Sequence, residues 1–170
     1  MEGCSGVIDE ELLSRAAALL EAYRAAGLKL ATAESCTGGL VAACLTEIAG
    51  SSDVVERGYV TYSNEAKTEM LGVPADLVVS CGAVSEEVAQ AMAEAALARS
   101  RVDVAVSITG IAGPGGATPE KPVGLVHFGL SRRGKPVSAR RREFPGDRRA
   151  VRRAAVMTAF DLLCEALESA

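Results

Sequence analysis

Two candidate nucleophiles, Ser35 and Cys36, stand side by side in the segment T-A-E-S-C-T-G-G, residues 32–39. The segment separates two apolar runs and ends on paired glycines. A serine or cysteine becomes an effective nucleophile when a neighbouring base takes its proton or when its surroundings lower its pKa. Two interpretations follow: the segment is a reactive strand-to-helix junction, or it is a helix cap beside a packed thiol. A mechanism through Cys36 is a minor variant of the first.

The search for a base to activate Ser35 leads to a lysine. The single histidine, His127, lies in an apolar segment, where a packed strand residue is the more common interpretation. A lysine acts as a base when burial or a nearby cation lowers its pKa. Lys67 ends the stretch G-Y-V-T-Y-S-N-E-A-K, one helical turn after a strand-like run. Its side chain can therefore return to the sheet edge. Tyr62, at the end of the strand-like run, could orient Lys67 or pass a proton. The alternative is an exposed helix lysine and a packed strand tyrosine.

Main-chain amides are the candidates for binding an anion beside Ser35. A helix that starts at Thr37 or Gly38 would leave the N–H groups of residues 36–39 free to hold a phosphate or an oxyanion. The alternative is that Thr37 is only an N-cap and that the glycines pack the helix on the sheet. A second glycine-rich segment, residues 109–116, follows a β-branched strand and is either a wall of the substrate pocket or a structural turn. It has neither the G-K-[ST] of a P-loop nor a G-x-G-x-x-G pattern.

Helices and strands alternate along the chain and must position these residues. Periodicity and capping residues such as Asp9, Gly27 and Ser85 predict helices over residues 10–26, from 37 or 38 to 48, and over 64–71, 85–100 and 147–169. Apolar and β-branched runs predict strands at 28–33, 57–63, 102–108, 123–131 and 136–144. We expect a single α/β domain over residues 1–170, with a core from about residue 10 to 169. Its three layers, α/β/α, would enclose a mostly parallel mixed sheet with an antiparallel edge hairpin.

Composition limits the classes of protein that the chain can represent. Hydrophobic residues make up 49% of it, which allows a real core, but the apolar runs are shorter than the roughly 18–20 residues of a membrane span. The N-terminus does not follow the order of a signal peptide. Five cysteines without a C-x-x-C pair do not indicate a disulfide framework or a zinc site. We therefore expect a cytoplasmic protein that neither contacts a membrane nor binds a metal.

Basic residues concentrate in one segment, although the whole chain has a net charge of −4. Residues 132–153 hold ten arginines and lysines against two acids, Glu143 and Asp147. The segment is either a solvated surface or an anion site for a phosphate. Nucleic-acid binding is the third alternative, because Phe144 is the only aromatic residue interleaved with these charges.

Three segments together resemble the family of the CinA C-terminal domain. They are T-A-E-S-C-T-G-G, then G-Y-V-T-Y-S-N-E-A-K-x-x-x-L-G-V, and then S-I-T-G-I-A-G-P-G-G with K-P-V-G shortly after it. The resemblance extends to G-A-V-S at residues 82–85 and G-D-R-x-x-V-R at residues 146–152, and so covers the chain from about residue 10 to the last helix. The family includes stand-alone nicotinamide-nucleotide amidohydrolases.

The resemblance implies an enzyme that hydrolyses the carboxamide of nicotinamide mononucleotide (NMN) to nicotinate mononucleotide and ammonia, without a metal or cofactor. The family pattern of a Ser-Lys pair with an assisting tyrosine falls on Ser35, Lys67 and Tyr62. The implied oxyanion donors are the amides of residues 36–39, and the other substrate-binding candidates, mainly for the phosphate, are Asn64, Thr109, Gly110 and Arg148.

The resemblance to the family also suggests an alternative function and the partners that we expect. Some members with this fold lack the deamidase activity, so the alternative is a non-catalytic nucleotide-binding or regulatory module. Longer members carry an N-terminal domain resembling molybdopterin-binding proteins; 170 residues leave no room for it, so we expect no pyrophosphatase activity tied to it. We expect a homo-oligomer and no nucleic-acid partner.

Overall fold

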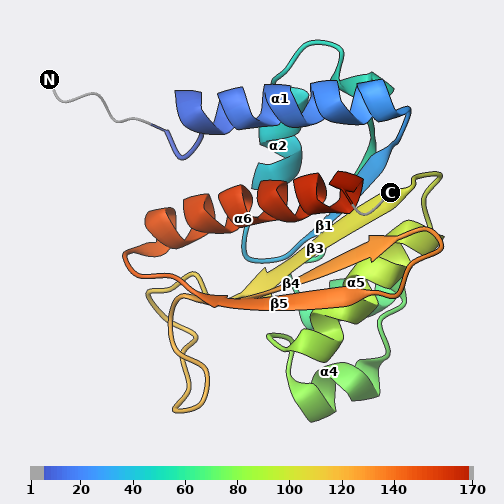
Figure 1. Ribbon diagram of the computed structural model, residues 1–170. Coiled ribbons are helices and arrows are strands. Elements are labelled where there is room, and N and C mark those ends of the chain that lie inside the picture. Colours follow the sequence, from blue (N-terminus) through green and yellow to red (C-terminus); the bar gives the residue numbers. More distant parts are fainter. Residues whose placement is uncertain (1–5, 169–170) are drawn as a thin grey trace, which may run out of the picture.

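The sheet of this computed structural model, which describes residues 6–168, has five strands in the order β2-β1-β3-β4-β5 (Figure 1). Strand β1 pairs in parallel with both β2 and β3, and the pairs β3–β4 and β4–β5 are antiparallel, so only β4 runs against the others. The predicted mixed, mostly parallel sheet with an edge hairpin is therefore confirmed. The strands are β1 (Leu30–Glu34), β2 (Val55–Val60), β3 (Val104–Gly110), β4 (Leu125–Arg132) and β5 (Ser138–Glu143).

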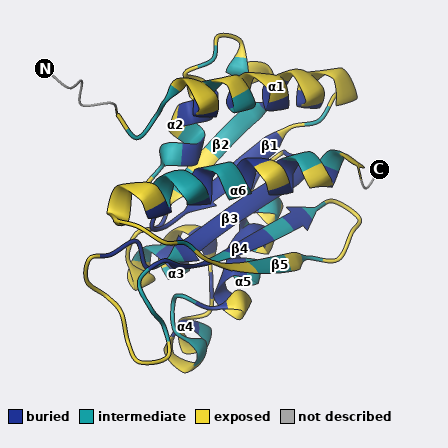
Figure 2. Ribbon diagram, turned by 60° about the vertical axis from the view of Figure 1, so that its left-hand side comes forward, coloured by how far each residue is buried: buried dark blue, intermediate teal, exposed yellow. Residues whose placement is uncertain are grey.

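Helices cover both faces of the sheet and complete the predicted α/β/α layers (Figures 1 and 2). One face carries α1 (Glu10–Ala26), α2 (Leu40–Thr46) and α6 (Arg148–Glu168). The other carries α3 (Asn64–Leu71), α4 (Ala75–Cys81) and α5 (Glu86–Ala98). A short 3₁₀ turn, Ser51–Asp53, leads into β2. Among the described residues, no helix has the length and hydropathy that crossing a membrane requires.

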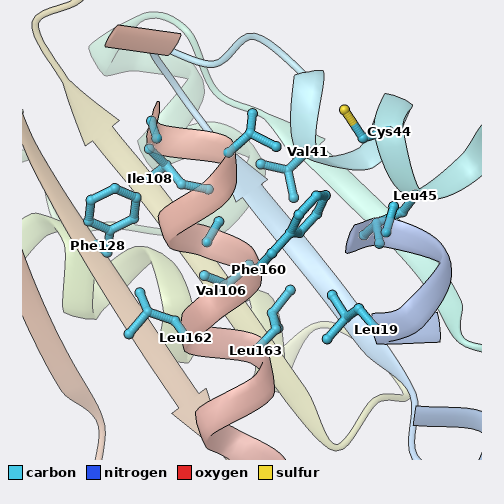
Figure 3. Close-up of a cluster of buried hydrophobic side chains, with 14 of the residues drawn as sticks. Leu19, Val41, Cys44, Leu45, Val106, Ile108, Phe128, Phe160, Leu162 and Leu163 are labelled. Carbon is cyan, nitrogen blue, oxygen red and sulfur yellow. The ribbon is translucent and has the colours of Figure 1, made fainter. Parts of the chain in front are cut away.

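The face under α1 and α6 holds the larger core. Strand residues Val106 and Ile108 of β3 meet Phe160 of α6 and Leu19 of α1 in one buried cluster (Figure 3). Each fully buried aliphatic or aromatic side chain of this kind contributes about 1.5–3 kcal/mol to folding. The cluster makes the sheet a rigid platform for residues that follow its strands.

The opposite face is packed more closely, with small residues between the sheet and α5. A Cβ at Gly129 of β4 would lie 2.2 Å from the carbonyl oxygen of Ala89 in α5, so only glycine fits there. The hydroxyl of Ser107 in β3 donates a hydrogen bond to the same carbonyl. The α5 main chain therefore rests directly on the sheet.

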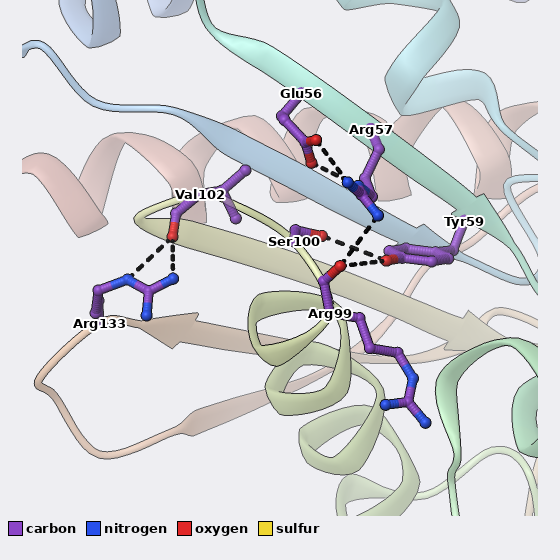
Figure 4. A network of polar contacts seen from close by, with 7 residues as sticks. All are labelled: Glu56, Arg57, Tyr59, Arg99, Ser100, Val102 and Arg133. Carbon is purple, nitrogen blue, oxygen red and sulfur yellow. Dashed lines mark hydrogen bonds and ion pairs between the residues drawn. The ribbon is translucent and has the colours of Figure 1, made fainter.

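Polar contacts join β2 and the β4–β5 hairpin to the segment between α5 and β3 (Figure 4). Arg57 Nη1 and the Tyr59 hydroxyl, both on β2, donate to the carbonyl of Arg99 after α5, at 3.0 and 3.3 Å. Arg133 Nη2, in the β4–β5 hairpin, donates to the carbonyl of Val102 at 2.8 Å. These bonds tie the β2 edge, the end of α5 and the hairpin to the sheet.

Several boundaries differ from the predicted ones. The last predicted residue of α6, 169, lies outside the described residues. Helix α2 begins only at Leu40, and its N-cap is Gly39, so the interpretation of Thr37 as the cap is wrong. Helix α4 was not predicted, because seven residues between Pro74 and Gly82 are too few to reveal a helical period. The caps Asp9 and Ser85 and the stop at Gly27 are confirmed.

Candidate functional site

Parallel pairing brings the ends of β1, β2 and β3 to one edge of the sheet. Glu34, the last residue of β1, pairs with Val60 of β2 and with Ile108 of β3. Ser35 directly follows β1, and the segment that leads to Lys67 directly follows β2. Ligands of open α/β sheets bind at this edge.

Lys67 and Ser35 are in hydrogen-bond contact there. The Lys67 Nζ lies 3.1 Å from the Ser35 Oγ, 2.9 Å from the carbonyl oxygen of Thr61 and 3.4 Å from that of Ser63. Lys67 is 1% exposed, and burial lowers the pKa of its amine. A neutral amine has two N–H groups and one lone pair. The two carbonyls can accept both N–H groups, which leaves the lone pair for the Ser35 hydroxyl.

The local sequence explains why this lysine points inward. The Ser63 Oγ caps α3 by accepting from the Ala66 amide at 3.0 Å, and the helix ends at Gly72. Lys67 and Leu71, four residues apart, form the buried face of this short helix. The lysine therefore occupies a position that burial alone would assign to an apolar residue.

Glu34 fills the N-terminus of α2. This carboxylate is fully buried, and its Oε2 accepts from the amides of Gly39 and Val41 at 3.1 and 3.0 Å. Its Oε1 accepts from the amide of Ala42 at 2.9 Å. The Gly38 amide donates to the carbonyl of Ser35 at 2.9 Å. The expectation that the amides of Gly38 and Gly39 are free for an anion is therefore wrong.

The amides of Cys36 and Thr37 are the remaining candidates for oxyanion donors. In the described part of the chain, neither of them donates a hydrogen bond to another residue. The Thr37 carbonyl accepts from Arg152 Nη2 of α6 at 2.9 Å, which holds the turn from its other side. Burial raises the pKa of the Cys36 thiol to about 12, the opposite of an activated nucleophile.

A cavity of about 190 Å³ opens beside Ser35. No acidic side chain lines it among the described residues. Its lining comes from the junction after β1, from Tyr62, from α6 and from the glycine-rich loop after β3: Ser35, Cys36, Tyr62, Arg148 and residues 110–113, 115 and 116.

Arg148 joins two walls of this cavity. Its Nη2 donates to the Tyr62 hydroxyl and its Nη1 to the carbonyl of Gly113, both at 2.9 Å. Tyr62 is 59% exposed, and its hydroxyl contacts Arg148 at the rim. The predicted contact between Tyr62 and Lys67 is not among the hydrogen bonds of the described residues.

Two of the predicted substrate-binding side chains lie outside the cavity. The Thr109 hydroxyl is buried and donates to the carbonyl of Ala83 at 2.7 Å, while its neighbour Gly110 does line the cavity. Asn64 instead lines a different hollow of about 380 Å³ between α3 and α4.

The basic segment divides into two parts. On β5, Arg140 pairs with Glu165 of α6 at 2.7 Å, and Arg141 pairs with Glu143 at 3.2 Å. Arg148 and Arg152 instead reach the cavity and the turn behind it. The first part is a solvated surface, and the second supplies positive charge at the site.

Sequence reasoning missed Glu34 and Arg152. A signal for Glu34 was present, since it is the one charged residue in a strand that is otherwise apolar or small. Arg152 is the last residue of the G-D-R-x-x-V-R motif. Among the described residues, no group of three or more His, Cys, Asp or Glu side chains is arranged to hold a metal ion.

Comparisons with known proteins show the family of the chain. A model of the CinA C-terminal domain matches residues 12–167. A protein of Escherichia coli named nicotinamide-nucleotide amidohydrolase PncC is 51% identical over 156 residues, which cover 91% of this chain and 94% of that protein. A CinA-like protein of Citrifermentans bemidjiense is 54% identical over 154 residues, 91% of this chain but 36% of that protein.

Solved structures share the fold. The crystal structure of the competence/damage inducible protein CihA from Agrobacterium tumefaciens superposes with a TM-score of 0.88 at 46% identity, covering 98% of this chain and 99% of that one. The chain belongs to the CinA C-terminal domain family. It spans about a third of the length of most of the curated relatives that it matches.

Proposed function

We propose that this protein hydrolyses the carboxamide of NMN to nicotinate mononucleotide and ammonia. The observation that carries the proposal is the buried Lys67 amine, 3.1 Å from the Ser35 hydroxyl beside an open cavity. The E. coli relative of nearly equal length, whose name states an activity on nicotinamide nucleotides, supports the substrate.

The first step joins the Ser35 Oγ to the amide carbon. The hydroxyl proton passes to the Lys67 lone pair, and the carbonyl electrons move onto oxygen. The amides of Cys36 and Thr37 are our candidates for stabilising that oxyanion, and one such donor typically contributes about 3–4 kcal/mol to the transition state.

The second step breaks the carbon–nitrogen bond. Lys67 returns its proton to the departing nitrogen, ammonia leaves, and Ser35 carries the acyl group as an ester. Water then attacks the ester carbon while Lys67 takes a water proton. When the ester bond breaks, that proton goes back to the Ser35 Oγ.

Charge at the site supports a substrate with a phosphate and a pyridinium ring. An arginine has five N–H donors, so Arg148 can contact a phosphate as well as Tyr62 and Gly113. The pyridinium charge helps to keep Lys67 neutral, because a nearby like charge lowers the pKa of an amine.

The test is ammonia release from NMN by the wild-type protein, Ser35→Ala and Cys36→Ser. The proposal expects turnover by the wild type and by Cys36→Ser, and a loss of at least about a thousandfold in Ser35→Ala. Unimpaired Ser35→Ala would exclude the mechanism. Nucleotide-dependent thermal stabilisation of a wild type that releases no ammonia would favour the non-catalytic binding module instead.

Two further parts of the proposal are a cytoplasmic location and assembly into a homo-oligomer. Composition supports the first, and the family supports the second. Light scattering of the purified protein measures the mass of the assembly; the mass of a single chain would contradict the second.

A further inference from the structure

Among the residues that the structure describes, Glu34 is the one fully buried carboxylate, and the proposed mechanism gives it no step. It immediately precedes Ser35, and both of its oxygens accept main-chain amides at the start of α2. Its main-chain carbonyl accepts the amide of Thr61 at 2.8 Å. The carbonyl of Thr61 in turn accepts from the Lys67 Nζ at 2.9 Å.

We infer that Glu34 is a positioning residue for the Ser35–Lys67 pair, because its side chain fixes the turn that carries Ser35 and its main chain fixes the acceptor of Lys67. The inference rests on the proposed function. In this arrangement, the Glu34 carboxylate occupies the N-terminus of α2, where a substrate anion was expected to bind.

The geometry calls for a carboxylate at this position. Three N–H groups, from Gly39, Val41 and Ala42, converge on two oxygens, and the carboxylate accepts all three. A glutamine has one carbonyl oxygen, so its NH₂ group would face at least one of these donors. The turn would have to shift, and a shift of about 1 Å in a reacting atom costs on the order of a hundredfold in rate.

The first test compares Glu34→Gln with Asp9→Asn in NMN turnover. Asp9 is the matched control, because its carboxylate also caps a helix, accepting from the Leu12 amide at 3.0 Å. It pairs with Arg153 of α6 and does not line the cavity. For Glu34→Gln we expect kcat to fall about tenfold to a hundredfold with KM within about threefold. Asp9→Asn should lose stability and keep its kcat. Equal kcat values for Glu34→Gln and wild type, with both folded, would overturn the inference.

The second test needs no turnover, so it separates this inference from the proposed function. The chain has four lysines, and NMR of Cε-labelled lysine can follow the titration of Lys67 without substrate. In the wild type, burial lowers the pKa of Lys67. The variant for this test is Glu34→Asp, which keeps the negative charge, so a shift reports the change in burial. If the shorter side chain loosens the turn and Thr61, water reaches the amine and the titration midpoint should move upward by at least about half a unit, with no such shift in Asp9→Asn. An unchanged midpoint in Glu34→Asp would contradict the positioning role.

A shorter acid covers the case in which Glu34→Gln does not fold. Glu34→Asp keeps the charge but is one methylene shorter, so it cannot reach all three amides from the same backbone position. We expect a folded variant with reduced kcat and an upward shift of the Lys67 titration. A folded Glu34→Asp that matches the wild type in both measurements would overturn the inference.

Discussion

Two strand-to-helix junctions at the same sheet edge supply Ser35 and Lys67, and they are built differently. The junction from β2 to α3 is short and is capped locally by Ser63, as α1 and α5 are capped by Asp9 and Ser85. The junction from β1 to α2 is a wider turn through Gly38 and Gly39, with φ values of 60° and 93°, and its cap is the buried Glu34 carboxylate of the preceding strand.

The difference shows how the two members of the pair are specified. The position of Ser35 depends on a buried charge and on glycines that adopt positive φ without steric cost. The chemistry of Lys67 depends on burial, which lowers its pKa, and on two carbonyl acceptors. Around the β2–α3 junction, kcat should therefore be most sensitive to substitution of Lys67 and much less sensitive to substitution of the junction residues themselves.

Lys67→Met should have the largest effect. It removes the proposed base and keeps a side chain of similar length, and a general base contributes about a hundredfold to ten-thousandfold to a rate. We expect kcat to fall within that range while the Tm does not decrease, because the variant no longer buries an amine. A kcat within threefold of the wild type would show that Lys67 is not the base.

The pH dependence of kcat/KM should follow the same amine. Activity requires neutral Lys67, so kcat/KM should rise about tenfold per pH unit below the folded-state pKa of Lys67 and level off above it. The folded-state pKa of Lys67 is below its value in the unfolded chain. At pH values between these two pKa values the folded state binds fewer protons than the unfolded state, so the free energy of unfolding should increase with pH there. A profile of kcat/KM that stays flat below the folded-state pKa of Lys67 would contradict a lysine base.

Tyr62→Phe should have a smaller effect, mainly on KM. Its hydroxyl accepts from Arg148 at the exposed rim, so the variant loses an anchor of the arginine that we propose for the phosphate. We expect KM to rise severalfold and kcat to stay within about threefold. Steady-state kinetics test this; a hundredfold loss of kcat would indicate that Tyr62 relays a proton.

Ser63→Ala should have the smallest effect on turnover. Loss of a serine N-cap costs about 1 kcal/mol, which corresponds to a decrease in Tm of about 2–4 °C in a chain of this size. The Ser63 carbonyl that faces Lys67 remains, so kcat should be unchanged. A tenfold loss of kcat would mean that turnover depends on the cap of the β2–α3 junction as strongly as on the β1–α2 turn.

The sequence predicted the layers of the fold from local patterns. For Lys67, local patterns left an exposed helix lysine as an alternative, and the resemblance to the family implied its pairing with Ser35. Hydrophobic periodicity and caps mark α1, α3 and α5, and parallel strands bring their carboxyl ends to one edge. The start of α2 was predicted too early, because its cap reaches across the turn from Glu34, a contact that no local pattern encodes.

The lining of the site was less predictable, because it depends on side-chain directions. Thr109 directly precedes a residue that lines the cavity, yet its own hydroxyl points to the carbonyl of Ala83. Asn64 begins the helix that carries Lys67 but lines a different hollow, between α3 and α4. Arg152 reaches Thr37 from a helix more than a hundred residues further along the chain.

The central claim is that Ser35 forms a covalent acyl intermediate, and trapping that intermediate tests it most directly. Reactions of wild-type protein with NMN are quenched during the first turnover, digested and mapped by mass spectrometry. We expect an added mass equal to the substrate less ammonia, located on Ser35 and lost in Ser35→Ala. An adduct on Cys36, or full turnover by Ser35→Ala, would contradict it.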